Sequence, residues 1–115
     1  MNLLNLEEEK YKNVKIGGYE FKIRFISPQD SILITRRRQT MQGGAPVESL
    51  LNTEFQFMDN IATVDVCTES YPKGFDQTES CVKWPDATLI NELANAIREH
   101  TAEFEAKLKK NRPVS

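Results

Sequence analysis

The chain has 115 residues, of which 39% are hydrophobic and 28% are charged, and it carries a formal net charge of −2. This length suits one domain with one hydrophobic core. No apolar run approaches the roughly 20 residues that span a bilayer, and the first residues become acidic too early for a secretion signal. We therefore expect no membrane association and a cytoplasmic location.

Residues 1–12 have a weak pattern, and we expect them to be frayed or to form a short helical arm. In the following stretch, NVKIGGYEFKIRFI, apolar and charged residues alternate on both sides of Gly17 and Gly18. This pattern predicts a β-hairpin, because paired glycines supply the positive φ angles that tight hairpin turns require. A two-stranded ribbon is marginal by itself, so its apolar face must pack against another element.

A helix is predicted next, from about Pro28 to Met41. Ser27 can cap its first turn, Pro28 fits the first helical position, and Asp30 suits the positive end of the helix dipole. The β-branched run SILIT within it could also form a strand. The sequence QGGAP at 42–46 ends this element.

The segment from Val47 to about Glu69 predicts a second helix with two apolar stripes. The first stripe contains Leu51, Phe55, Met58, Ala62 and Val66, and the second contains Leu50, Phe57, Ile61 and Val64. A helix that is apolar over more than half of its circumference either lies at the centre of a small domain or buries one stripe on another chain.

Two acidic residues, Glu54 and Asp65, lie between these stripes, about three turns apart. They either mark an exposed seam or pair with Arg36, Arg37 or Arg38, within the fold or across a subunit boundary.

Residues 70–83 form a long connection, and loops of this length are often functional or mobile. Cys67 and Cys81 lie close to its two ends and lack the CxxC spacing of metal sites. We expect two free thiols in a reducing compartment, and a disulfide between them is the alternative.

Pro85 and Asp86 begin a third predicted helix, which runs to about Lys110. One apolar stripe along it contains Leu89, Leu93, Ile97, Phe104 and Leu108. Some 25 residues make a rod of roughly 37 Å, which spans a domain whose expected radius of gyration is near 13 Å. We therefore expect the last two residues of the stripe to project past the core, and residues 111–115 to be a flexible tail.

Residue types suited to catalysis do not form a recognisable set. The common nucleophile, phosphate-loop, dinucleotide and zinc-protease motifs do not occur. His100, the single histidine, is expected on the surface or at a seam, and a metal site with Glu99 or Glu103 would lack a third ligand. We expect no enzymatic activity, no cofactor and no metal.

The adjacent residues Arg36, Arg37 and Arg38 are the best candidates for a nucleic-acid contact. On a helix they point in three directions, roughly 100° apart, so they do not form a phosphate-tracking strip. Residues 1–46 carry a charge of +3 and residues 47–115 a charge of −5, which favours self-association or a charged protein partner over nucleic acid. A small nucleic-acid-associated regulator that uses these arginines is the alternative function.

Together these elements predict a mainly helical α+β fold, in which residues 13–110 form a β-hairpin followed by three helices. The two striped helices carry more apolar surface than a three-helix domain needs to bury, and such an excess marks a binding surface. We predict that this surface holds an amphipathic helical client and supports self-association. The predicted partner-binding residues are Phe57, Ile61, Val64, Phe104 and Leu108.

Two stretches carry a resemblance to a known family. They are IGGYEFKIRFISPQD, a glycine turn and strand leading into a capped helix, and VKWPDATLINELANAIREHTAEFEAKL, a tryptophan-led helix with Leu/Ile spacing. The layout of residues 14–110 resembles the tail assembly chaperones of long-tailed bacteriophages. The resemblance implies a non-enzymatic, self-associating protein of the host cytoplasm that coats the tape measure protein, recruits tail tube subunits and is absent from the finished particle.

The same resemblance implies a programmed frameshift near the end of the gene, which yields a longer product in many such phages. The sequence KLKKNRPVS is compatible with an A-rich slippery run. A virion component such as a tail terminator or connector is a third option, which the modest β content disfavours.

Overall fold

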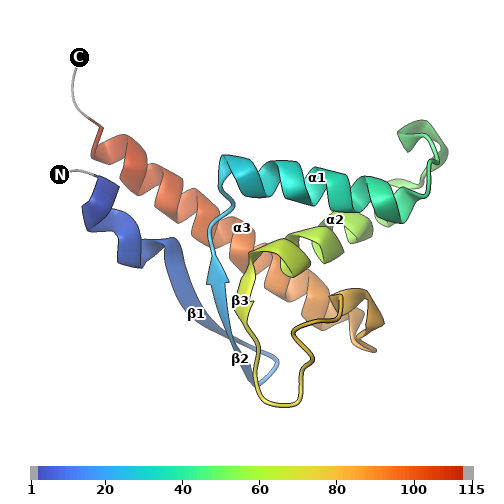
Figure 1. Ribbon diagram of the computed structural model, residues 1–115, viewed down its shortest axis with the longest axis horizontal. Coiled ribbons are helices and arrows are strands. Elements are labelled where there is room, and N and C mark those ends of the chain that lie inside the picture. Colours follow the sequence, from blue (N-terminus) through green and yellow to red (C-terminus); the bar gives the residue numbers. More distant parts are fainter. Residues whose placement is uncertain (1–2, 113–115) are drawn as a thin grey trace.

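The structure, a computed structural model, describes residues 3–112 (Figure 1). Its elements are η1 (Leu3–Lys10), β1 (Tyr11–Ile16), β2 (Tyr19–Arg24), α1 (Pro28–Gln42), η2 (Val47–Ser49), α2 (Asn52–Cys67), β3 (Thr68–Ser70), η3 (Cys81–Lys83) and α3 (Ala87–Lys110), where η denotes a 3-10 helix. The predicted fold class, a mainly helical α+β fold with an N-terminal hairpin followed by three helices, is confirmed. Residues 113–115 of the predicted tail and residues 1 and 2 of the predicted arm lie outside the described residues.

The hairpin forms where the alternation predicts it. Strands β1 and β2 pair antiparallel along their whole length. At the turn, Gly17 and Gly18 have φ angles of 58° and 85°, which glycine adopts without a steric penalty. The apolar face of the hairpin is carried by Phe21 and Ile23, which are buried against the helices.

A third strand, β3, was not predicted. It pairs antiparallel with β2, so that β2 becomes the central strand of the order β1-β2-β3. It follows α2 directly and contains three residues, which are too few to show the two-residue period of a strand. Only its pairing with β2 stabilises it as a strand.

Helix α1 confirms the predicted start and end. Ser27 and Asp30 form a capping box, and Gly43 ends the helix in the left-handed conformation with a φ of 61°. These two caps explain why the run SILIT is helical. Among its apolar residues only Ile34 is fully buried, whereas Ile32 and Leu33 face solvent.

Helix α2 begins five residues later than predicted. Residues 47–49 form the turn η2 instead, and Leu51 at the N-cap position provides no side-chain hydrogen bond to the first turn. The α-helix itself starts at Asn52 without a capping side chain. The rest of α2 lies between α1 and α3 and contacts both.

The core is formed by side chains from all three helices, the sheet and the connection before α3. Its buried members are Phe21, Ile23, Ile34, Ile61, Ala62, Val64, Cys67, Cys81, Leu89, Ile90, Leu93, Ala94 and Ile97. Both cysteines are free, which confirms the predicted thiols and excludes the disulfide alternative.

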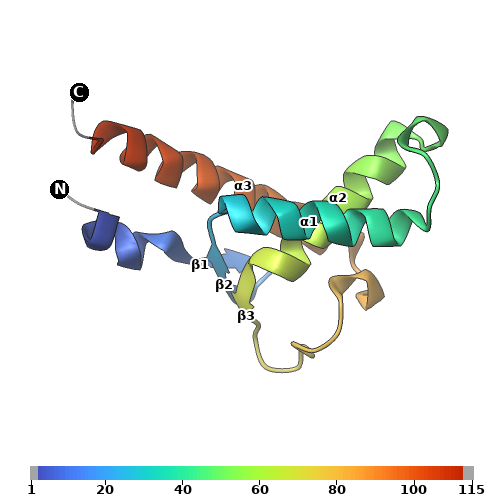
Figure 2. The same ribbon diagram turned by 45° about the horizontal axis from the view of Figure 1, so that its top comes forward.

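The N-terminal segment forms the helical arm, one of its two predicted states. Figures 1 and 2 both show η1 beside the C-terminal half of α3. Leu6 is buried, and two ion pairs join this end of the chain to α3: Lys107 with Glu9 at 3.4 Å and Lys12 with Glu103 at 3.6 Å. The arm therefore covers the part of α3 that was expected to lack a partner within the chain.

The molecule is thin and extended. Its principal extents are 45 × 36 × 21 Å and its radius of gyration is 15.5 Å, above the 13 Å expected for a compact domain of this length. The hairpin of helices α1 and α2 extends away from the sheet in one direction, and the end of α3 extends in another (Figure 2). A thin molecule has little interior, so several apolar side chains stay at its surface.

Candidate functional site

The residues predicted to bind a partner are mostly interior. Ile61, Val64 and Phe104 are at most 3% exposed, and Phe57 and Leu108 are half-buried. The prediction that they form an exposed partner surface is therefore wrong for the three buried residues. Helices α1 and α3 cover the second stripe of α2, and the Phe104 ring packs on Phe25 with the ring centroids 4.2 Å apart.

His100 is also buried, which rules out the surface position among its two predicted positions and leaves the seam. Its Nε2 lies 2.9 Å from the backbone carbonyl oxygen of Lys10. The imidazole therefore joins α3 to the end of η1, and it has a structural role.

Two of the three adjacent arginines form ion pairs with α2, and the third faces solvent. Arg37 Nε lies 2.7 Å from Asp65 Oδ2, so the predicted pairing within the fold is confirmed for this pair. Arg38 pairs instead with Asp59 at 3.0 Å. Within residues 3–112, Arg36 and Glu54 are exposed and make no ion pair. Two of the three cations are thus neutralised by carboxylates, which weakens the nucleic-acid alternative.

Asp59 and Asp65 each connect α2 to two other parts of the chain. Asp59 also accepts a hydrogen bond from Arg98 of α3 at 2.8 Å, and Asp65 accepts hydrogen bonds from the Ser80 hydroxyl and from the Cys81 backbone N–H. Carboxylates shared in this way fix the order of α1, α2, α3 and the loop before α3. They support the fold and do not form a site open to a ligand.

Several large apolar side chains are exposed elsewhere, singly at Leu51 and Val82 and as an adjacent pair on α1. Ile32 is 54% exposed and Leu33 is 41% exposed. Leu33 lines a groove of about 390 Å³ together with Tyr11 and Phe25. We call this space the hairpin–α1 groove, since it lies between the ends of the hairpin strands and the first turns of α1.

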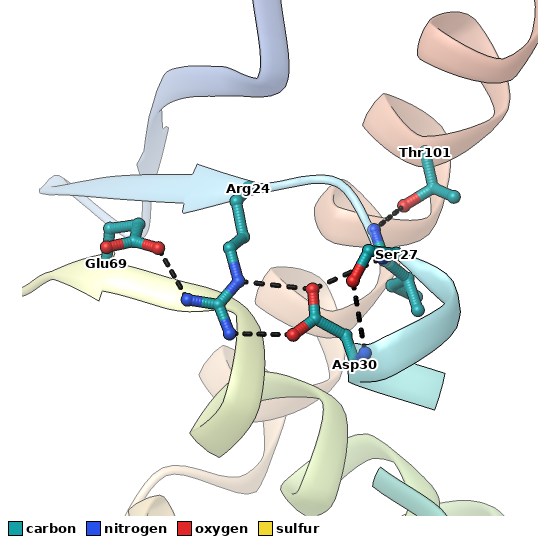
Figure 3. A network of polar contacts seen from close by, with 6 residues as sticks. Arg24, Ser27, Asp30, Glu69 and Thr101 are labelled. Carbon is teal, nitrogen blue, oxygen red and sulfur yellow. Dashed lines mark hydrogen bonds and ion pairs between the residues drawn. The ribbon is translucent and has the colours of Figure 1, made fainter. Parts of the chain in front are cut away.

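The base of the hairpin–α1 groove is a polar network centred on Arg24 (Figure 3). Arg24 reaches from β2 between Asp30 of α1 and Glu69 of β3. Its Nε and one terminal nitrogen donate to the two oxygens of Asp30 at 3.2 and 2.8 Å, and the other terminal nitrogen donates to Glu69. This fork-to-fork geometry is the strongest pairing available to an arginine and a carboxylate.

The same aspartate also caps α1. Asp30 accepts a hydrogen bond from the Ser27 backbone N–H at 3.2 Å and donates its own backbone N–H to the Ser27 hydroxyl at 3.1 Å. The preceding residue, Ile26, donates its backbone N–H to the Thr101 hydroxyl of α3 at 2.9 Å. The hairpin, α1, β3 and α3 are therefore joined at one point beneath the groove.

The electrostatics of this network keep it ionised. Burial alone would raise the pKa of Asp30, but hydrogen bonds from Arg24 and Ser27 lower it below its ordinary value. The hydrogen bond to Asp30 raises the pKa of Arg24, and the bond to Glu69 adds to this. The base of the groove is thus a cluster that is charged at neutral pH and internally paired.

The polar side chains of the groove are largely engaged with one another. Arg24 directs three of its nitrogens to carboxylates, Asp30 is held by the capping box, and the Ser27 hydroxyl accepts from the backbone of α1. Tyr11, Phe25 and Leu33 give the groove an apolar side next to this polar base. Such an apolar side can take up an apolar side chain of another protein.

Sequence reasoning missed this site, although a signal was present. Ile32, Leu33 and Ile34 are consecutive, so on a helix they cover about 200° of its circumference. A helix packed on one side cannot bury all three. The run therefore predicts exposed apolar side chains once it is known to be helical.

Within residues 3–112 no cluster of three or more histidine, cysteine, aspartate or glutamate side chains has an arrangement that could hold a metal ion. In the same part of the chain, every helix is too short or too polar to cross a bilayer. Comparison of the chain with protein-family models, characterised proteins and solved structures finds no match.

Proposed function

We propose that this chain is a non-enzymatic assembly chaperone that holds an apolar helical client along α1, over Ile32 and over Leu33 at the hairpin–α1 groove. The observation that carries this proposal is the exposure of Ile32 and Leu33 on α1. This helix is capped at both ends and joined to α2 by two ion pairs, so local unfolding does not account for their exposure. Large apolar side chains on a rigid surface are typical of interaction sites.

The proposed mechanism is contact between helices. A client helix lying along α1 would cover Ile32 and Leu33 and insert one apolar side chain between Tyr11 and Phe25. Each half-exposed aliphatic side chain that the client covers would contribute about 1 kcal/mol. The charges at the base of the groove are already paired, so an apolar side chain does not isolate an unpaired ion.

We further propose the tape measure protein of a long-tailed bacteriophage as the client and the tail tube protein as the second partner. Support comes from the layout of residues 14–110, which resembles the tail assembly chaperones, and from the helical, apolar character of a tape measure protein. We expect self-association in the host cytoplasm through the same face of α1, because an exposed apolar strip can also be covered by a second copy.

The proposal is tested with a variant that changes only this face. The double substitution Ile32→Ser, Leu33→Ser should reduce complex formation with a co-expressed tape measure segment at least tenfold, measured by size-exclusion chromatography with light scattering. The melting temperature should change by less than about 3 °C, because neither side chain is buried in the core.

Val82→Ser provides the matched control. Val82 is 53% exposed and lies in η3, which does not line the hairpin–α1 groove. This control should bind the segment as the wild type does. Undiminished binding by the double variant would contradict the proposal.

A further inference from the structure

A second pocket lies at the opposite end of the sheet from the hairpin–α1 groove. It has a volume of about 330 Å³ and is lined by residues of the hairpin, the loop 70–83 and the start of α3. These backbone segments lie in the lower part of Figure 1. Three aromatic residues line it: Tyr19, Phe75 and Trp84. We call it the aromatic pocket.

The Phe75 ring stands nearly perpendicular to the rings of Tyr19 and Trp84. The Tyr19 and Phe75 centroids are 5.1 Å apart with an interplanar angle of 79°, and the Phe75 and Trp84 centroids are 5.0 Å apart with an angle of 74°. Behind them, Phe21 packs on Phe75 and Trp84. Tyr19 is 46% exposed, so part of this rigid aromatic surface is open to solvent.

The rim of the aromatic pocket is acidic. Asp76, Glu79 and Asp86 line it together with one cation, Lys83. Lys83 lies 3.4 Å from Glu79, and the hydrogen bonds from Thr78 lower the pKa of Asp76. The rim therefore keeps a net charge of about −2 at neutral pH.

None of the cations in the described residues occupies this aromatic surface. The two cation–π contacts of residues 3–112 are elsewhere, with Lys22 over Tyr11 and Arg38 over Phe55. A purely apolar ligand would lie next to the rim carboxylates without pairing with them, and an anion would be repelled by them. An aromatic surface with a negative rim fits a cation.

We propose that the aromatic pocket binds the guanidinium group of an arginine side chain from a partner protein. Guanidinium is planar, stacks on aromatic rings, and pairs with carboxylates through a fork of N–H donors. Stacking on Trp84 or Tyr19 would leave its edge free to donate to Asp76 or Glu79. This site is separate from the hairpin–α1 groove, so it holds whether or not the chaperone proposal does.

The chain contains its own probe for this proposal, because Trp84 is the single tryptophan. The peptide acetyl-Ala-Arg-Ala-amide is titrated into the full chain while the Trp84 emission is followed. We expect a saturable change with a dissociation constant of about 1 mM, as a short peptide with one anchoring side chain allows. The citrulline peptide, which has the same shape without the charge, should bind at least ten times more weakly.

Two variants test separately the contributions of the rings and of the carboxylates to binding. Tyr19→Ala removes an exposed ring, and Asp76→Asn removes a charge while keeping an acceptor for Thr78. Each should weaken binding of the arginine peptide about fivefold or more. Lys83→Gln removes the cation next to Glu79 and should strengthen binding.

Tyr11→Ala is the matched control, since Tyr11 is an exposed tyrosine of the same hairpin that does not line the aromatic pocket. It should bind the peptide as the wild type does. Equal binding of the citrulline peptide, or no saturable change with either peptide, would overturn the proposal. A wild-type emission that changes with protein concentration alone would assign the pocket to a second copy and would also overturn it.

Discussion

Asp30 joins three parts of the fold through a single carboxylate. It accepts hydrogen bonds from Arg24 of β2 and from the Ser27 backbone N–H at the start of α1, and Arg24 extends the connection to Glu69 of β3. Because the Asp30 side chain is 8% exposed, water screens these contacts little. The charge of one residue therefore contributes to the position of the hairpin, α1 and β3.

This arrangement predicts how stability depends on pH. The folded-state pKa of Asp30 lies below its ordinary value, so the unfolded chain binds a proton at a higher pH than the folded chain does. The contribution of Asp30 is then fully present above the unfolded pKa of about 4 and is lost as the pH falls through the folded pKa. Urea unfolding between about pH 6 and pH 2 should show this decrease in the free energy of unfolding.

Asp30→Asn should be less stable than the wild type at neutral pH and should lose less stability on acidification. The amide keeps one acceptor for the capping box but cannot pair with the Arg24 charge. Parallel pH profiles for the two proteins would show that this network does not contribute as described.

At the scale of elements, the helices are held together by shared carboxylates and by coverage from short segments. Asp59 connects α2 to α1 through Arg38 and to α3 through Arg98. The 3-10 helix η1 covers the later turns of α3, and its Leu6 is buried there. Coverage by so short a segment depends on few side chains.

Leu6→Ala should therefore destabilise the protein by about 2 kcal/mol, at the low end for a buried leucine because a terminal segment can readjust. Thermal or urea unfolding measures the change. Hydrogen exchange of α3 should increase mainly around Phe104, which lines a shared surface pocket with Glu8 and Glu9 of η1. An unchanged free energy of unfolding would show that η1 does not stabilise α3.

At the scale of the whole molecule, two buried thiols report on opening of the core. Cys67 and Cys81 are fully buried, at the end of α2 and just before α3. Burial raises the pKa of Cys67 to about 12 and also raises the pKa of Cys81 above its ordinary value. Since the thiolate is the reactive species, neither thiol is suited to reaction in the folded chain.

A thiol reagent at about pH 8 should therefore label the native protein slowly, at a rate set by opening of the core, and should label both thiols at once in denaturant. Mass spectrometry follows each cysteine separately. Rapid labelling of either thiol while circular dichroism shows native structure would contradict the buried positions described above.

Local patterns in the sequence determined much of the fold. The alternation around Gly17-Gly18, the Ser27-Pro28 start of α1 and the Pro85-Asp86 start of α3 each predicted an element that the structure contains. These signals act over a few residues, through backbone sterics, capping hydrogen bonds and side-chain periodicity, so they can be recognised without knowing what packs against them.

Only the tertiary structure decided which apolar residues stay exposed. Periodicity assigned Ile61 and Val64 to a partner surface, but α1 and α3 cover them, whereas Ile32 and Leu33 have nothing over them. Likewise, Asp65 forms an ion pair with Arg37, whereas Glu54 forms none within residues 3–112. Burial and pairing depend on segments far apart in the chain, and their positions follow from the packing of the whole molecule.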